Sequence, residues 1–157
     1  MTPGAAGVTV RPAVGADVER MVELLGYGAL PPVAPDPAQP VDLAAPRRAW
    51  AEIDAGPGAL LVAEVGGEVM GVCQLIVFRH FQSGGGLCAE LESVHVHPDR
   101  RGHGIGRLLI AAAVDRARAL GCYRVQLTSN VARTEAHHFY GSLGFTPSHV
   151  GFKMLLG

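Results

Sequence analysis

Residues 97–109 read HPDRRGHGIGRLL, with glycine at positions 102, 104 and 106. An alternating apolar run precedes this stretch, and apolar residues at helical spacing follow it. The pattern predicts a loop that leads from a strand into the start of a helix. Such a loop points free backbone N–H groups outward, and the helix dipole adds to their preference for an anion. Because glycine lets a phosphate approach the backbone closely, a pyrophosphate is the expected ligand.

Two common phosphate-binding motifs do not fit this loop. A Walker loop requires glycine followed directly by lysine, but the only lysine of the chain is Lys153. A dinucleotide-binding fingerprint requires its third glycine at position 107 or 109, where the chain has Arg107 and Leu109. The loop therefore belongs to another class of phosphate site.

The sequence around the loop predicts an α/β fold. The expected order is strand, two helices, three strands, helix, strand, helix and two strands, which gives a mixed, mostly antiparallel sheet flanked by helices. A turn at Gly66 and Gly67 joins two of the strands as a hairpin. The expected strands are 8–13, 59–65, 69–78, 87–96, 123–129 and two short strands around a turn within 145–156; the expected helices are 15–28, 45–56, 104–120 and 133–144.

Two of these helices have a clear apolar face. We expect the residues on each face to pack against the sheet, and we expect Gly121 and Gly144 to end the helices that precede them. The expected faces are Val18, Met21, Val22 and Leu25 in the first helix, and Ile105, Leu109, Ala113, Ala117 and Leu120 in the third.

Composition predicts one globular domain over residues 1–157, since 48% of the residues are hydrophobic and 17% are charged. The formal net charge of -1, without a basic stripe, argues against nucleic-acid binding. The sequence contains no run of about 18 apolar residues, so no membrane span is expected. The odd number of cysteines, three, predicts buried free thiols in a reducing compartment and hence a cytoplasmic protein. Six prolines in residues 31–46 predict an exposed, extended loop.

Residues 101–106, Arg-Gly-His-Gly-Ile-Gly, match the pattern [QR]-x-x-G-x-[GA] at a helix start. This stretch closely resembles the pyrophosphate-binding motif of the GNAT superfamily of acyl-CoA-dependent N-acyltransferases. Asn130 and the segment FYGSLGF, residues 139–145, follow in the order and spacing of that family. The resemblance is clear over residues 87–145, which it identifies as the cofactor-binding core, and looser from residue 59 to the end.

The resemblance implies that the chain uses acetyl-CoA as a co-substrate. The backbone amides of 102–107 would hold the pyrophosphate, and the pantetheine arm would pair with the strand backbone at 94–96, where the sheet splays. The side chains of Val94 and Val96 can at the same time belong to the core, and Asn130 can be an ordinary turn or cap residue. The residues expected to bind the cofactor are Val94, His95, Val96, Arg101, Gly102, His103, Gly104, Ile105, Gly106, Arg107 and Asn130.

Acetyl transfer to an amine requires a base, because an ammonium group with a pKa of about 10.4 is not a nucleophile. Alternation along the strand puts Glu90 and Glu92 on the same side as Val94 and Val96, near the reacting end of the cofactor. In the resembled family the base often precedes this contact by two or four residues. Glu92 is therefore the first candidate and Glu90 the second, although both can also be solvated carboxylates.

Tyr140 is the candidate acid, because a phenol with a pKa of about 10 can protonate a departing thiolate with a pKa of about 8.5. A tyrosine on an apolar helix face is often a core residue, but the resembled family places a tyrosine here beside the cofactor sulfur. The histidine pairs at 95 and 97 and at 137 and 138 lack a third ligand at suitable spacing, so no metal is expected.

The sequence thus predicts an N-acetyltransferase in which a primary amine attacks acetyl-CoA directly. The alternative is an acyl-CoA-binding regulatory or sensor module without turnover. The acceptor, a small-molecule or peptide amine, has no readable motif, and a homodimer is possible from the resemblance.

Overall fold

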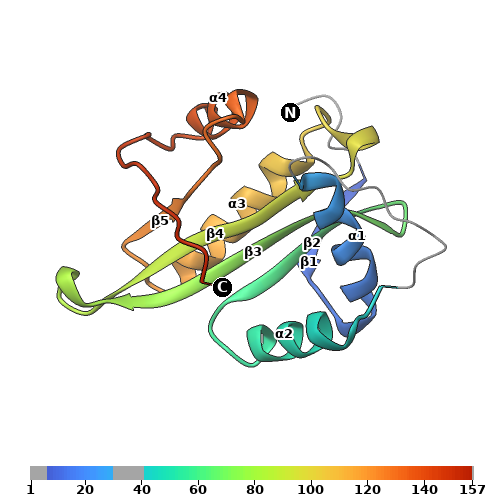
Figure 1. The fold of residues 1–157 in the computed structure, drawn as a ribbon, viewed down its shortest axis with the longest axis horizontal. Coiled ribbons are helices and arrows are strands. Elements are labelled where there is room, and N and C mark those ends of the chain that lie inside the picture. The colour runs from blue at the N-terminus through green and yellow to red at the C-terminus, as the bar shows by residue number, and fades with distance from the viewer. Residues whose placement is uncertain (1–6, 30–40, 157) are drawn as a thin grey trace.

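Five strands form one mixed sheet in the order β1-β2-β3-β4-β5 (Figure 1). The structure is a computed structural model that describes residues 7–29 and 41–156. The first three pairs of neighbours are antiparallel and β4 pairs with β5 in parallel. The predicted mixed, mostly antiparallel sheet is therefore confirmed. The strands are β1 Val8–Pro12, β2 Ala59–Val65, β3 Glu68–His80, β4 Gly86–Val96 and β5 Arg124–Leu127.

The predicted hairpin joins β2 to β3. Gly66 and Gly67 have φ angles of 60° and 85°, which residues with a side chain rarely adopt, so the two-residue turn depends on glycine. The predicted ends of β1 and β4 also hold, since Pro12 is the last residue of β1 and Pro98 follows β4 closely.

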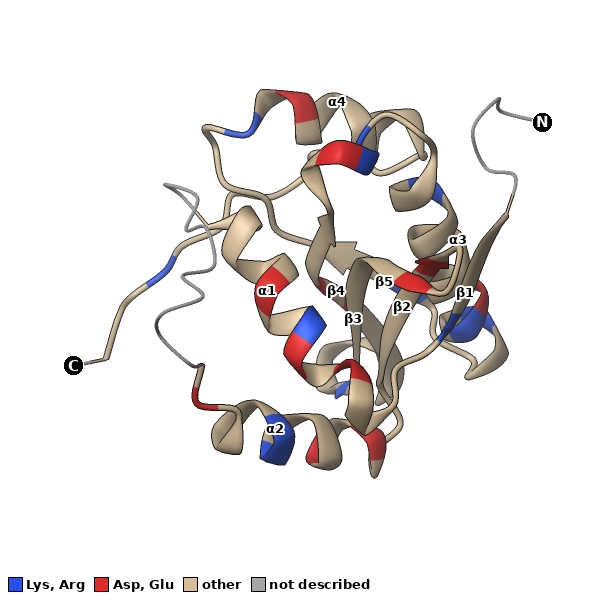
Figure 2. Ribbon diagram, turned by 90° about the vertical axis from the view of Figure 1, so that its right-hand side faces the viewer, with Lys and Arg blue, Asp and Glu red and all other residues tan. Residues whose placement is uncertain are grey.

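Four helices flank the sheet, with α1 and α2 on one face and α3 on the other (Figure 2). Short 3-10 helices precede α1 at Gly15–Asp17, follow β3 at Phe81–Ser83 and follow β4 at Pro98–Arg100. The α-helices are α1 Val18–Gly28, α2 Ala44–Asp54, α3 Ile105–Ala119 and α4 Thr134–Ser142.

Each face of the sheet has its own hydrophobic core. On one face Leu109 of α3 packs with Leu75 and Leu91 of the sheet, and on the other Val18 and Leu24 of α1 pack with strand residues. Two predicted core positions are wrong. Leu25 is 37% exposed because the buried stripe of α1 runs through Leu24 instead, and Leu120 is also 37% exposed because it lies beyond the last turn of α3.

A buried carboxylate joins β1 to α1. Asp17, only 8% exposed, accepts two hydrogen bonds from the guanidinium of Arg11, at 2.7 and 3.1 Å, and one from the Val14 N–H at 2.8 Å. Arg11 also donates to Glu64 of β2 at 3.0 Å. These bonds favour the ionised form, so they hold the pKa of Asp17 below its usual value.

The predicted pair of strands at 145–156 is wrong. This segment contains no strand; its backbone forms a local bond at 2.9 Å from the Ser148 N–H to the Thr146 carbonyl. Alternating apolar residues do not make a strand without a neighbour to complete the ladder. The segment runs on the same side of the sheet as α1 and α2 (Figures 1 and 2). Its large apolar side chains are 77 to 95% exposed: Val150, Phe152, Met154, Leu155 and Leu156.

The predicted proline-rich loop lies mostly outside the described residues, which resume at 41. Helix α2 begins at Ala44, so the last three residues of the predicted loop, 44–46, belong to the helix. Pro46 falls in the first turn of α2, as expected, where its missing N–H has no helical partner to lose. Cys73 and Cys88 are buried free thiols, as expected, and Cys122 is half-buried. No helix within the described ranges is both long and apolar enough to cross a bilayer.

Candidate active site

A β-bulge interrupts β4 in the middle of the sheet. Gln74 lies opposite Glu92, and Val72 lies opposite His95, so Ser93 and Val94 together face the single residue Cys73. Ser93 has a φ angle of 52° and is the one residue other than glycine with positive φ in the described part of the chain.

The bulge changes which residues of β4 point to each face of the sheet. Before it, Leu91 points into the core beneath α3; after it, Val94 and Val96 pack against that same core. Glu92 and His95 pair with Gln74 and Val72, so they lie on the opposite face, toward α1. The prediction that Glu90 and Glu92 share a face with Val94 and Val96 is therefore wrong, because the bulge adds one residue to the alternation. The predicted core position of Val94 and Val96 is confirmed.

The sheet opens beyond the bulge. Strand β5 pairs with β4 only over Cys88–Leu91, so the backbone of 92–96 has no strand partner on that side among the described residues. Two adjoining cavities of about 350 and 500 Å³ occupy the opening. We call the smaller one the inner cavity; it is lined by Glu92, Asn130, Tyr140 and Lys153, among others. The larger, outer cavity is lined by Tyr27, Val96, Arg101 and the start of α4.

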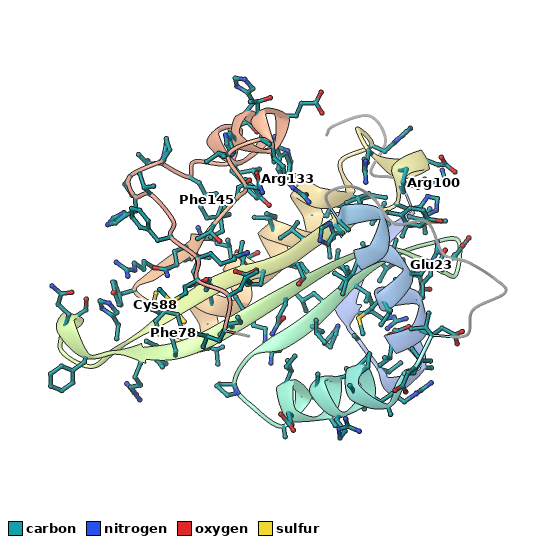
Figure 3. All side chains as sticks on the ribbon, viewed as in Figure 1. Glu23, Phe78, Cys88, Arg100, Arg133 and Phe145 are labelled. Atoms are coloured by element: carbon teal, nitrogen blue, oxygen red, sulfur yellow. The ribbon has the colours of Figure 1, made fainter. Side chains whose placement is uncertain are left out.

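Arg133 stands where the two cavities meet (Figure 3). Its guanidinium Nη2 donates a hydrogen bond to the carbonyl of Gly28, the last residue of α1. The imidazole of His95 packs directly on Gly28, since a Cβ there would lie 1.9 Å from His95 Cε1. The end of α1, the end of β4 and the start of α4 are thus brought together without a side chain at position 28.

The glycine-rich loop leads into α3 as predicted. Gly102 and Gly104 have φ angles of 76° and 83°, and no atom lies within 4 Å of the position a Cβ would take on Gly102. The first helical bond runs from the Leu108 N–H to the Gly104 carbonyl at 3.2 Å, so the amides of 105–107 are not engaged by the helix. Gly106 has a different role, because its Cβ would lie 3.3 Å from Phe139 of α4.

Three basic side chains of the loop have partners within the fold. Arg101 Nε donates to the Val96 carbonyl at 3.2 Å, and Arg107 Nη2 donates to Ser142 Oγ of α4 at 3.2 Å. The ring Nδ1 of the exposed His103 lies 2.8 Å from the Arg101 carbonyl. Arg100 of the same loop is exposed, so the loop can meet an anion with its backbone amides and with this guanidinium.

The two candidate bases differ in their surroundings. Glu90 accepts a hydrogen bond of 2.7 Å from Gln126 Nε2 of β5, whereas Glu92 lines the inner cavity. Burial raises the pKa of Glu92, and the nearby charge of Glu90 raises it further. Burial, followed by the charges of Arg133 and Arg101, lowers the pKa of His95 and favours its neutral form.

Tyr140 shares the inner cavity with Glu92, although the two residues come from different elements. Its ring centroid lies 5.3 Å from that of Phe139 and 6.0 Å from that of Phe145. Burial is the main cause of a raised pKa, which keeps the phenol of Tyr140 protonated. The tyrosine thus packs against the core, as one of the two interpretations expected, and lines the cavity; its role as the acid beside the cofactor sulfur stays a prediction.

Asn130 lines the inner cavity and also shapes the turn into α4. Its Oδ1 accepts the Ala132 N–H at 2.9 Å, and its carbonyl accepts the Arg133 N–H at 2.9 Å. Asn130 thus has the turn role that was the alternative to cofactor binding, and its binding of the cofactor stays a prediction. Gly28 and Lys153 are among the cavity residues that sequence reasoning missed; being the single lysine of the chain was the one signal that marked Lys153. The described residues contain no group of three or more potential metal ligands.

Residues 24–145 match the Acetyltransferase (GNAT) family. The chain belongs to the GNAT acetyltransferase family. The predicted family membership is confirmed, and the match includes the end of α1, the bulged strand, the glycine-rich loop and α4.

Several GNAT acetyltransferases are similar in sequence. The chain is 33% identical over 140 residues to L-amino acid N-acyltransferase MnaT of Escherichia coli (strain K12), covering 88% of this chain and 79% of that protein. It is 34% identical over 90 residues to aminoalkylphosphonate N-acetyltransferase of Salmonella typhimurium, covering 57% of this chain and 58% of that protein. The match to glucosamine 6-phosphate N-acetyltransferase of Trypanosoma brucei brucei covers 52% of that protein, so the chain spans about half the length of these last two relatives.

Solved structures share the whole fold of this GNAT domain. The crystal structure of a transcriptional regulator from Bacillus halodurans C-125 matches with a TM-score of 0.85 and 36% identity, covering 95% of this chain and 99% of that one. An acetyltransferase of Trypanosoma brucei matches with a TM-score of 0.78 and 25% identity, covering 95% and 99%.

Proposed function

We propose that this GNAT family member is an N-acetyltransferase that moves the acetyl group of acetyl-CoA onto a primary amine. The observation that carries the proposal is the shared inner cavity of Glu92 and Tyr140, at the opening of the sheet and adjoining the outer cavity that reaches Arg101. A base, an acid and an anion-binding loop are the three parts that the reaction needs.

The chain has room and donors for acetyl-CoA. Its pyrophosphate would bind the unused amides at the start of α3, and its pantetheine arm would extend along the unpaired backbone of 94–96. When bound, acetyl-CoA supplies a thioester carbonyl that an amine can attack. His95 and Val96 in the outer cavity and Asn130 in the inner one line the path between these points.

Glu92 acts as the base in this proposal, directly or through a water molecule. The amine nitrogen forms a bond to the thioester carbonyl carbon, and the proton that it loses goes to the Glu92 carboxylate. A carboxylate with a raised pKa is a better proton acceptor than an ordinary glutamate, which supports this role. Glu90, bound to Gln126, is the second candidate.

Tyr140 acts as the acid. When the carbon–sulfur bond breaks, the departing thiolate takes the phenolic proton of Tyr140. The raised pKa of Tyr140 supports this role, because the phenol must carry its proton at neutral pH to donate it.

The acceptor class follows from the relatives, whose names include an L-amino acid N-acyltransferase and an aminoalkylphosphonate N-acetyltransferase. A small-molecule primary amine is therefore the proposed acceptor, with a peptide amine as the alternative. We place the reaction in the cytoplasm, where free Cys73, Cys88 and Cys122 would stay reduced. The protein is proposed to act as a single-domain homodimer, supported by the exposed apolar side chains of 150–156.

One observation favours a second function, a sensor that binds acyl-CoA without turnover. The structure with 36% identity is described as a transcriptional regulator. The test is thiol release from acetyl-CoA, measured with a panel of amines and one peptide while acetyl-CoA binding is followed by calorimetry. An enzyme releases thiol with at least one amine, whereas a sensor binds acetyl-CoA and releases none.

A further inference from the structure

Two opposite charges line the inner cavity from different parts of the chain. Glu92 belongs to β4, and Lys153 belongs to the C-terminal segment, which runs on the side of the sheet toward which Glu92 points. Lys153 is the only cation of residues 145–156, as the sequence shows. The segment therefore places one positive charge beside the proposed base.

The two charges do not neutralise each other by direct contact. None of the ion pairs within 4.0 Å among the described residues includes Lys153 or Glu92. Lys153 is nevertheless close enough for its charge to lower the pKa of Glu92, against the larger effects of burial and Glu90. A cavity with separated charges of opposite sign is complementary to a molecule that carries the opposite pair.

We propose that this cavity selects a zwitterionic acceptor, whose amine faces Glu92 and whose carboxylate, phosphonate or phosphate group is bound by Lys153. The proposal rests on the acetyl transfer proposed above and names the substrate class of that same cavity. Lys153 is then a specificity residue that touches the acceptor away from the reacting nitrogen.

The other basic groups of the cavity are less suited to bind this anion. Arg133 already donates to the Gly28 carbonyl, and the lowered pKa of His95 favours its neutral form. The ammonium group of Lys153 offers three donors on a flexible stem at the wall of the inner cavity, so it can turn toward an acceptor bound there. A volume of about 350 Å³ suits a small acceptor such as an amino acid.

The test compares three acceptors that differ at one group: L-phenylalanine, L-phenylalaninamide and 2-phenylethylamine, each with saturating acetyl-CoA. For L-phenylalanine, K153Q should raise KM by roughly 10-fold or more with little change in kcat, as expected for a charged hydrogen bond made in both ground and transition states. For the two acceptors without a carboxylate, KM should change by less than about twofold. K153R should restore most of the affinity for L-phenylalanine.

Arg48→Gln is the matched control, because Arg48 is an exposed cation of α2 that does not line either cavity. It should leave all three KM values unchanged. The proposal is overturned if K153Q changes the KM values of the three acceptors equally, or if it leaves the KM for L-phenylalanine unchanged while thiol release continues. Absence of thiol release from the wild-type protein with every amine overturns the proposed acetyl transfer itself, and the substrate class with it.

Discussion

Gln126 Nε2 donates a hydrogen bond of 2.7 Å to Glu90 Oε2, which ties one of two neighbouring carboxylates to β5. The other, Glu92, lines the inner cavity with Tyr140. The distinction between the two could not be made from their spacing along the strand. It makes Glu92 the stronger candidate for the base, and the two residues a natural pair for comparison.

Glu92→Gln should lower kcat/KM by roughly 100-fold or more, the usual range for loss of a general base. Because the pKa of Glu92 is raised, the wild-type rate should fall as pH decreases through a value above that of an ordinary glutamate. The variant should lose this acidic limb, which a pH profile of thiol release measures. Glu90→Gln should keep the limb and most of the rate. Equal losses in both variants would argue against separate roles.

Tyr140→Phe should lower kcat strongly and leave the affinity for acetyl-CoA nearly unchanged, since only the phenolic proton is removed. Steady-state kinetics together with calorimetric titration of acetyl-CoA separate the two quantities. Replacement by phenylalanine keeps the packing against Phe139 and Phe145, so stability should be preserved. Loss of both turnover and affinity, or of neither, would contradict the proposed acid.

Gly102→Ala should weaken acetyl-CoA binding by about 5- to 30-fold, because a side chain at a φ of 76° costs about 1–2 kcal/mol and shifts the backbone amides. Gly84→Ala is the matched control. Gly84 has a φ of 65° and equally open surroundings, but it lies in the turn between β3 and β4. Gly84→Ala should lower the free energy of unfolding by a similar amount and leave the affinity for acetyl-CoA unchanged. Similar affinities for the two variants would argue against the loop as the pyrophosphate site.

Asp17→Asn should lower the free energy of unfolding by roughly 1–3 kcal/mol, because it leaves buried donors of Arg11 and Val14 poorly satisfied. The folded-state pKa of Asp17 is below its usual value, so its contribution is present above the unfolded pKa and is lost as pH falls through the folded pKa. Urea unfolding at pH 7 and in acid measures both effects. A variant as stable as the wild type at pH 7, with the same loss in acid, would contradict this role.

The chain should behave as a dimer whose interface includes the C-terminal segment. Phe152 is 95% exposed, which is unfavourable for a large apolar side chain in a monomer with several similar neighbours. Light scattering should give the mass of two chains, and Phe152→Ser should shift the equilibrium toward one. Phe81→Ser should leave this equilibrium unchanged, because Phe81, although 98% exposed, lies in the turn between β3 and β4 and not in the C-terminal segment. A monomeric wild type would contradict the prediction.

The sequence predicted the features that depend on local chemistry. Glycines at 66, 67, 102 and 104 occupy positive φ angles, so the hairpin and the helix start could be predicted from residue type alone. The candidate pair Glu92 and Tyr140 came from a family resemblance, and the structure brings the two into one cavity. In each case the prediction depended on the backbone conformation of the residue itself or on its place in a known motif.

The errors concern features that depend on a distant partner. The bulge at Ser93 results from the way β4 pairs with β3, and no residue in the sequence of β4 indicates it. The strands expected at 145–156 do not form, because the segment has no neighbouring strand to pair with among the described residues. Lys153 reaches the inner cavity from the far end of the chain, so its position could not be read from the residues beside it.

The extra residue at Ser93 has a consequence for how this domain can diversify. Substitutions along β4 leave every side chain on its present face, so the acceptor end of the cavity can be remodelled one side chain at a time. If β4 kept its length but paired regularly with β3, the faces of everything beyond Glu92 would exchange, and the valines would turn away from the core beneath α3; deleting one residue between Glu92 and His95 would instead keep those faces. At its present length, the bulge with its positive φ at Ser93 is therefore what a designer or a lineage must keep in this strand.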